Sequence, residues 1–550
     1  MVGYKEVFSM SAGQVTDATP PGTVTLSAHP SHVTEQRHRV HGQELRLSPQ
    51  PSSDPLDPLN WTAWRKIAAL ICMSMYAAVG NFTSSSIASA FPLYVTPLAF
   101  DPPVSIGRLT HLVAVNVLMM GAANIWWVPL ANTFGRRPII LGNILLLVFS
   151  SMWAGLANNF GSLLAARVFM GVAVAPADTI APNIVGEIFF THQQGRAMGC
   201  YTVCIALGPI IGGIAGGYIA GNQGLAWIHW VNVILSAILF VACVFLLPES
   251  LYSRGPLATT TEQITDDEMS KNHNDKDSEL VENVPSHPEE SLDPGQQSAN
   301  FSRLMRLYTF QGGSTFVPNF LAPWKTLRLP GVWLAMLWYA GLVGGVVTIT
   351  TVGPTIVASP PYLWGNNAGL IMVGGIVGSI MGFLATNLGS DRVVTTKKVL
   401  SGAQFVEPEA RLPIAIPGLL LATTGLWTFG FCAQQSGPHM WIGMEFGLGM
   451  LCFGLVQAPS IGFNYIIDSY GPISADCFVA VTCMRAIISF AWTFFAGEWV
   501  TKAGAATPFG TFGALMGLFS LLVFPLWLWG KRLRIVTANW VPSSWDGFQA

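Results

Sequence analysis

The sequence predicts an all-α membrane protein whose twelve transmembrane helices form two bundles of six. Hydrophobic residues make up 51% of its 550 residues, and charged residues make up only 10%. Soluble proteins usually carry about 25% charged residues. The much lower charged fraction of this chain indicates that most of its surface does not face water. Twelve apolar runs recur along the chain, and one long polar segment divides them into two sets of six.

A transmembrane helix needs about 20 mostly apolar residues to cross a hydrocarbon core of about 30 Å. Six such runs precede the polar segment: Ile67–Phe91, Leu109–Ala131, Pro138–Leu156, Ser162–Ala181, Ala197–Ala220 and Ala226–Leu247. Six more follow it: Leu329–Val352, Asn366–Thr386, Leu412–Cys432, Met440–Ser460, Ala475–Glu498 and Pro508–Gly530. We number these runs as spans one to twelve in chain order.

The segments outside the spans differ in composition from the spans themselves. Residues 1–60 are rich in Pro, Ser, Thr and His and lack the apolar core of a cleavable signal peptide, so we expect a disordered cytoplasmic tail. Residues 251–328 are crowded with acidic groups from Asp266 to Asp293, which favours a largely disordered cytoplasmic loop. The remaining divisions are the two bundles, residues 61–250 and 329–530, and a short cytoplasmic tail, residues 531–550.

Basic residues in the short loops predict the orientation of the chain, because cytoplasmic loops carry an excess of Lys and Arg. If the N-terminus lies inside the cell, the outer loops hold little beyond Arg108 and Lys502. The inner segments then hold the other basic groups: Arg65, Lys66, Arg136, Arg137, Arg196, Arg254, Arg392, Lys397, Lys398 and the stretch from Lys531 to Arg534. We therefore expect a multi-pass protein of the plasma membrane with both termini in the cytoplasm.

The turn between spans two and three reads Gly135-Arg136-Arg137-Pro138. Glycine allows a sharp turn, and two arginines beside it can bind acidic groups or lipid phosphates. Ordinary positive-inside charge is the alternative interpretation. The segment resembles the loop motif of the major facilitator superfamily, a Gly, an Asp and a basic pair between these spans, although the sequence departs from it at Val128, Asn132 and Thr133. The resemblance implies a gating loop at Gly135, Arg136 and Arg137.

Span four contains two ionisable residues, Arg167 and Asp178, which lie eleven residues apart. In a continuous helix that spacing brings both side chains to one face, within ~20° of each other. An ionisable group inside a membrane costs roughly 2.5–3.5 kcal/mol by insertion scales and is seldom present without a role. We therefore assign proton and substrate coupling to Asp178 and Arg167, with a structural polar pair as the alternative. Arg167 followed by Gly171 also resembles the fourth-span pattern of the superfamily.

Span five contains Gly208-Pro209-Ile210-Ile211-Gly212-Gly213. Glycines at 208, 212 and 216 form a smooth stripe for close helix packing, and Pro209 bends the helix. The form Gly-Pro-x-x-Gly-Gly resembles the signature of drug:proton antiporters within the superfamily, although Cys204 stands where that signature usually has Gly. Flanking segments such as Asp57-Pro58-Leu59-Asn60-Trp61 resemble fungal members of that group, and the resemblance extends over residues 55–530.

Span ten contains a further intramembrane acid, Glu445, one helical turn from Trp441. A cation at this position could meet both a carboxylate and an aromatic face. Glu445 is therefore the second candidate, after Asp178, for the carboxylate that carries the proton.

The resemblance implies alternating access, in which the two bundles rock about a central site. A carboxylate that must lose its proton before substrate binds would couple the two flows. We expect a proton-coupled antiporter that exports small organic compounds such as toxins, drugs or secondary metabolites. A proton-driven importer of polyamine-like organic cations is the main alternative. A non-transporting nutrient sensor is less favoured, because only about 20 residues follow the last span.

The expected partners are a small organic substrate, protons and the lipid bilayer, and we expect a monomer. The sequence shows no clustered catalytic, cofactor or metal-ligand pattern, so we expect neither an enzyme nor a cofactor or metal site. The formal net charge of −2 provides no basic face for nucleic acid. The sequence does not identify the substrate, because substrate choice depends on the side chains that line a cavity at mid-membrane.

Overall fold

The structure is a computed structural model. It describes residues 57–95, 103–252, 316–386, 405–435 and 437–540, together with short parts of the first 56 residues: 4–10, 14–15, 18, 20, 24–25, 37–40 and 43–46. The acidic segment from Asp266 to Asp293, for which composition predicts disorder, lies outside the described residues.

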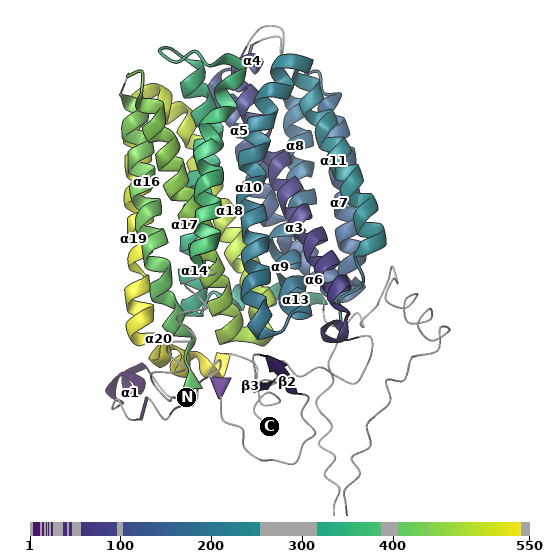
Figure 1. Ribbon diagram of the computed structural model, residues 1–550, viewed down its shortest axis with the longest axis vertical. Helices are drawn as coiled ribbons and strands as arrows, with labels where there is room; N and C mark the ends of the chain where they lie inside the picture. The colour runs from purple at the N-terminus through teal and green to yellow at the C-terminus, as the bar shows by residue number, and fades with distance from the viewer. Residues whose placement is uncertain are drawn as a thin grey trace, which may run out of the picture.

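Spans one to six pack together as the N-terminal half, drawn in purple and blue in Figure 1. Spans one and two contain α3 (Ala63–Ser85), α4 (Phe91–Tyr94), α5 (Ile106–Ala122) and α6 (Asn124–Phe134). Spans three and four contain α7 (Arg136–Gly155), α8 (Phe160–Val174) and α9 (Pro176–Ile188). Spans five and six are α10 (Thr191–Gln223) and α11 (Leu225–Leu246).

Spans seven to twelve form the C-terminal half beside it, drawn in green to yellow (Figure 1). Spans seven to nine are α14 (Pro330–Ala358), the helical segment Gly365–Thr386 and α16 (Ile416–Gln434). Spans ten to twelve contain α17 (Met440–Tyr470), α18 (Ser474–Ala503), α19 (Ala506–Leu521) and α20 (Val523–Thr537). Within the described residues, twelve helical segments are long and apolar enough to cross a membrane. The predicted all-α fold with twelve spans is therefore confirmed.

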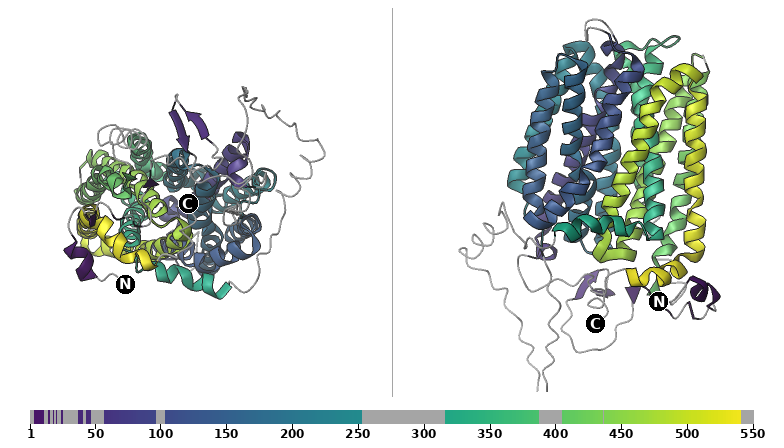
Figure 2. Two further views of the ribbon diagram at one scale, coloured as in Figure 1. Left: turned by 90° about the horizontal axis from the view of Figure 1, so that it is seen from below. Right: turned by 180° about the vertical axis from the view of Figure 1, so that it is seen from behind.

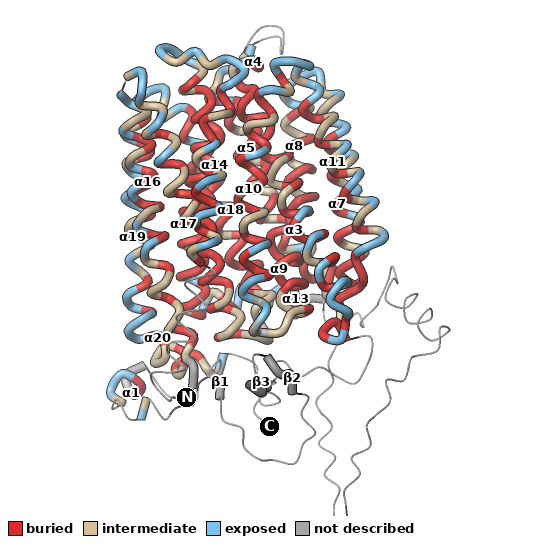
Figure 3. The backbone as a smooth tube through the Cα atoms, in the orientation of Figure 1, coloured by how far each residue is buried: buried red, intermediate tan, exposed pale blue. Residues whose placement is uncertain are grey.

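Each half has its own hydrophobic core. One cluster of buried side chains comes mainly from spans one to six, with Val479 and Cys483 of α18 added. The other comes mainly from spans seven to twelve, with Ala206 and Ile210 of α10 added. Buried residues therefore line the contacts between helices, while the outer helix surfaces carry exposed residues (Figure 3). Many of these exposed side chains are large and apolar, as expected for a surface in contact with lipid.

Two helix pairs make the most extensive contacts between the halves. α5 packs along α18 so closely that a Cβ added to Gly121 would overlap the Cβ of Ala486. α10 packs against the start of span eight, where a Cβ added to Gly369 would lie 2.7 Å from the carbonyl oxygen of Gly213. Small residues at these contacts let the backbones of the two halves approach each other, as is common between helices in membranes.

The glycine stripe of span five packs against span one. A Cβ added to Gly208 or Gly212 would lie 2.6 or 2.5 Å from a backbone carbonyl oxygen of α3, and one added to Gly216 would overlap a carbonyl at the end of that helix. Spans eight and ten of the C-terminal half also pack closely at a glycine, because a Cβ added to Gly378 would overlap the carbonyl of Gly449 in α17. Larger side chains at these positions would force the helices apart.

The lower face in Figure 1 carries α1 (Tyr4–Ser9), α13 (Phe316–Thr326) and the end of α20. α13 lies across the lower ends of α6 and α18, which belong to different halves (Figure 2, right). Strand β1 (Val24–Thr25) pairs antiparallel with β4 (Phe405–Val406), and β2 (Arg37–Val40) pairs antiparallel with β3 (Gln43–Arg46). Short elements therefore occur within the N-terminal tail, for which composition predicts disorder.

Candidate functional site

The hydrogen-bond ladder of span four is interrupted near its middle, and we call this place the break in span four. α8 ends at Val174 and α9 begins at Pro176, and Pro182 lies inside α9. Proline has no N–H with which to bond the carbonyl four residues before it, so both prolines interrupt the helical ladder. Asp178 stands in the first turn of α9, where the dipole of the helix favours a negative charge.

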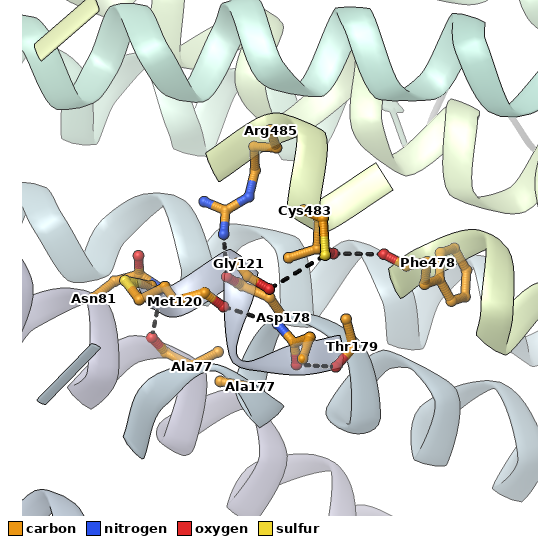
Figure 4. Close-up of polar contacts among 12 residues, drawn as sticks. Ala77, Asn81, Met120, Gly121, Ala177, Asp178, Thr179, Phe478, Cys483 and Arg485 are labelled. Carbon is orange, nitrogen blue, oxygen red and sulfur yellow. Dashed lines mark hydrogen bonds and ion pairs between the residues drawn. The ribbon is translucent and has the colours of Figure 1, made fainter. Parts of the chain in front are cut away.

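The Asp178 carboxylate pairs with the guanidinium of Arg485, which comes from α18 in the other half (Figure 4). The exposed fraction of the side chain is 1% for Asp178 and 3% for Arg485. The Arg485 guanidinium carbon also lies 5.3 Å from the ring centroid of Tyr339 in α14. A buried ion pair therefore joins the two halves. Removal of one partner would leave an uncompensated buried charge, which typically costs about 3–5 kcal/mol.

A small cavity lies beside this ion pair. Its polar lining consists of Asn81, Ser84 and Ser85 from span one, Thr350 from span seven and Arg485 from span eleven. Valine, methionine and proline side chains of both halves complete it, and Arg485 is the charged side chain in the lining. The cavity measures about 20 Å³, room for about one water molecule. Pockets for organic ligands hold roughly 300–1,000 Å³, so the cavity in this structure is too small for an organic molecule.

Arg167 is fully buried but contacts backbone carbonyls rather than Asp178. Its guanidinium donates to the carbonyl oxygens of Leu112 at 3.2 Å, Thr83 at 2.7 Å and Ser84. These bonds tie span four to spans one and two. The expectation that Arg167 and Asp178 share one helix face assumes an unbroken span four. In the structure, Arg167 braces the N-terminal half, while Asp178, eleven residues further along the span, contacts the C-terminal half.

Glu445 lies apart from this ion pair, in α17 beside span eight. A Cβ added to Gly374 of span eight would lie 3.1 Å from the Cβ of Glu445. The Glu445 side chain is half-buried, and none of the ion pairs in the described part of the chain involves it. Trp441, one turn away, contacts Trp364 with 5.6 Å between the ring centroids. The structure therefore does not bring the two candidate acids, Asp178 and Glu445, together.

The turn between spans two and three lies at the lower face. Gly135 has a φ of 104°, a conformation that glycine adopts without strain. The Glu249 carboxylate accepts the backbone N–H groups of Arg136 at 3.0 Å and Arg137 at 3.1 Å, which satisfies free donors at the start of α7. The Arg136 guanidinium binds both carboxylate oxygens of Glu187 at the end of α9. This turn therefore connects spans three, four and six within one half.

The C-terminal half has a comparable ion cluster at its lower face. Arg534 of α20 pairs with Glu407 at 2.5 Å and with Glu409 at 2.7 Å. Arg411 pairs with Asp468 of α17 at 2.8 Å. The site residues proposed from the sequence do not include this cluster. Its signal in the sequence is the run of charges from Glu407 to Arg411, just before span nine.

The span-five motif lies where α10 contacts both halves. Gly208 and Gly212 face span one, and Gly213 faces Met372 of span eight. Pro209 contributes to the lining of the central cavity. The motif therefore allows α10 to pack against its own half and the opposite half at the level of the Asp178–Arg485 pair.

The site offers one carboxyl group, one cation paired with it and a cavity to which both halves contribute. Arg485 belongs to this candidate site and is not among the site residues predicted from the sequence. Its signal is an arginine in the middle of an apolar helix, a position that usually marks a functional or paired group. Within the described residues, no group of three His, Cys, Asp or Glu side chains could hold a metal ion.

Two six-helix halves that meet at a charged central site define the class of the protein, a polytopic membrane transporter. A sequence profile of the Major Facilitator Superfamily matches residues 67–476. The chain belongs to this superfamily, whose members are transporters rather than enzymes.

Fungal transporters are similar to this chain over most of its length. The MFS transporter cpaT of Aspergillus oryzae is 27% identical, over 88% of this chain and 90% of the relative. The efflux pump FUB11 of Gibberella moniliformis is 24% identical, over 86% of this chain and 74% of the relative. The partially occluded, inward-open xylose transporter XylE of E. coli has a similar fold, with a TM-score of 0.54 at 14% identity, over 84% of this chain and 99% of XylE.

Proposed function

We propose that this protein is a proton-coupled antiporter that exports small organic compounds, and that Asp178 carries the coupled proton. The observation that supports this proposal is the buried ion pair between Asp178 and Arg485. It links the two halves beside a cavity to which both halves contribute. A change in the charge of one side chain at this place alters the attraction between the halves, which must separate for alternating access.

The ion pair provides a lock whose strength depends on one proton. While Asp178 is ionised, its attraction to Arg485 holds α9 against α18. A proton on Asp178 removes that attraction, and the effect is large because the pair is shielded from water. Arg485 then keeps the ring face of Tyr339 as a partner, since aromatic rings attract cations.

The same carboxylate accounts for exchange of proton against substrate. Three groups compete for Asp178: the guanidinium of Arg485, a proton and a cationic group of the substrate. Because a protonated carboxyl carries no charge to attract a cation, proton and substrate exclude each other. Mutual exclusion at one site is the condition that an antiporter must meet.

The mixed lining of the cavity supports an amphiphilic substrate. Hydroxyl and amide groups of span one and apolar side chains of both halves surround the same space. The name of the similar efflux pump supports export as the direction of transport. We further propose that the protein works as a monomer in the plasma membrane, with its lower face and both termini in the cytoplasm, because the basic loop residues gather on that side.

Transport by the purified protein in lipid vesicles tests this proposal. Vesicles with an acidic interior are given ethidium or labelled spermidine outside, in the presence of the pH gradient. An antiporter accumulates the organic cation in exchange for outgoing protons. Asp178→Asn abolishes accumulation, while exchange of labelled for unlabelled cation persists with a raised KM, because the neutral side chain attracts the cation less. Accumulation only in vesicles with an alkaline interior would contradict antiport and indicate a proton-driven importer of organic cations.

A further inference from the structure

The broken segment of span four is held by side chains from three other spans. Trp127 of α6 donates its indole N–H to the carbonyl oxygen of Val172 at 3.0 Å. Tyr76 of α3 donates its hydroxyl to the carbonyl oxygen of Ala173 at 2.6 Å. Tyr201 of α10 donates its hydroxyl to the carbonyl oxygen of Ala177, directly before Asp178.

These donors replace bonds that an unbroken helix would make. In a regular α-helix, the carbonyl of Val172 would accept the N–H of residue 176, which is a proline. The carbonyl of Ala173 would accept the N–H of Ala177. Trp127 and Tyr76 supply hydrogen bonds to these two carbonyls, so the break leaves neither acceptor unsatisfied inside the membrane, where such a group costs several kcal/mol.

These contacts fix the end of α8 and the start of α9 to their own half. Tyr76 and Tyr201 are fully buried, and both belong to the N-terminal half. Thr179 donates to the side-chain oxygen of Asn124 in α6 at 2.6 Å, so the residue after Asp178 is also held from that half. The Asp178 side chain reaches across to Arg485 of the other half (Figure 4).

We propose that Tyr201, assisted by Tyr76, is a positioning residue that fixes the first turn of α9 and thereby presents the Asp178 carboxylate to Arg485. This inference rests on the coupling role proposed for Asp178. The Tyr201 hydroxyl anchors the carbonyl of the neighbouring residue, so its loss lets the first turn of α9 move relative to α18. The Asp178–Arg485 contact, which depends on the place of that turn, then weakens.

Replacement of Tyr201 by phenylalanine tests the proposal, because it removes the hydroxyl and keeps the ring. A matched control is Tyr218→Phe, which alters a tyrosine on the exposed side of the same helix. In acid-interior vesicles with ethidium, Tyr201→Phe should lower gradient-driven accumulation about five- to tenfold, the usual effect of one buried hydrogen bond. It should also shift the pH at which accumulation is half-maximal. Exchange of labelled for unlabelled cation should stay within about twofold of wild type, and Tyr218→Phe should change none of these rates.

The double variant separates positioning from general stability. Added to Asp178→Asn, Tyr201→Phe should cause no further loss of exchange, because its effect passes through Asp178. Equal loss of exchange in both backgrounds, with an unchanged pH profile, would show a merely structural role and overturn the proposal. Wild-type accumulation and pH dependence in Tyr201→Phe would also overturn the proposal. If Asp178→Asn still loses gradient-driven accumulation in that case, the proposed function stands. If Asp178→Asn itself behaves as wild type, the proposed function fails and this inference fails with it.

Discussion

Spans four and ten are the fourth helices of their respective halves, and each contains an acid, yet they differ in shape and surroundings. Span four is broken before Pro176, and its acid reaches the opposite half. Span ten is one continuous helix of 31 residues, with Pro459 inside it, and its acid, Glu445, lies beside span eight of its own half. The difference teaches that an intramembrane acid can lock the two halves together only where its helix delivers it to the contact between them.

The largest expected effect is at Asp178. Asp178→Asn keeps the shape of the side chain but cannot take up or release a proton. We expect it to abolish accumulation driven by a pH gradient in lipid vesicles while the protein still inserts and exchanges substrate. It should also lower the midpoint of thermal unfolding, because Arg485 loses its buried ion-pair partner. Asp178→Glu should keep part of the activity. If the Asn variant still concentrates substrate with wild-type pH dependence, the acid of span four is not the coupling acid, and it does not differ in this respect from the acid of span ten.

The second-largest effect on transport is expected at Arg485, because its loss leaves Asp178 without its ion-pair partner. We expect Arg485→Ala to reduce gradient-driven accumulation by more than about tenfold and to lower the midpoint of thermal unfolding, since an unpaired buried charge costs about 3–5 kcal/mol. Arg485→Lys keeps the positive charge and should recover part of both properties. Equal behaviour of the Ala and Lys variants would show that charge at this position does not matter.

The prolines test whether the break in span four is functional. Pro176→Ala restores an N–H group that can bond the carbonyl of Val172, so it should favour a straighter helix and move Asp178 away from α18. We expect accumulation to fall about three- to fivefold, as for the partial loss of one hydrogen-bonded contact. Pro459→Ala in span ten is the matched control and should change accumulation by less than about twofold. Similar losses in the two variants would remove the special role of span four.

The smallest expected effect is at Glu445. Glu445→Gln removes a half-buried charge that belongs to no ion pair in the described part of the chain. Because no partner is left uncompensated, accumulation should stay within about twofold of wild type, with unchanged pH dependence. Complete loss in Glu445→Gln, combined with activity in Asp178→Asn, would reverse the assignment of the coupling acid.

The sequence predicts the architecture well, because long apolar runs have few alternatives to membrane-spanning helices. The choice of Asp178 as a candidate also rests on one local fact, an acid inside an apolar span. Its partner could not be predicted in this way, since Arg485 lies 307 residues further along the chain and the rotation of two helices brings them together. Arg167 is a second example, because the backbone carbonyls of Leu112, Thr83 and Ser84 that it contacts cannot be read from the spacing along span four.

Polar contacts to the backbone are also invisible in the sequence. Tyr76, Trp127 and Tyr201 read as apolar packing residues, and only the fold places their donors next to the broken segment of span four. The prolines in that span are the local signal that some carbonyls need other donors. Which side chains provide them depends on the packing of spans one, two, four and five.

The most direct test of the account follows the two halves as the proton is added, without any substrate. Spin labels at Trp64→Cys on α3 and Trp529→Cys on α20, both exposed positions in opposite halves, would be introduced after replacement of the eight native cysteines. Electron–electron resonance distances are then measured from alkaline to acidic pH. We expect the distribution of distances to shift with pH in the protein with native Asp178 and to be independent of pH in Asp178→Asn. A pH-dependent shift of the same size in Asp178→Asn would contradict the claim that the Asp178–Arg485 pair locks the halves.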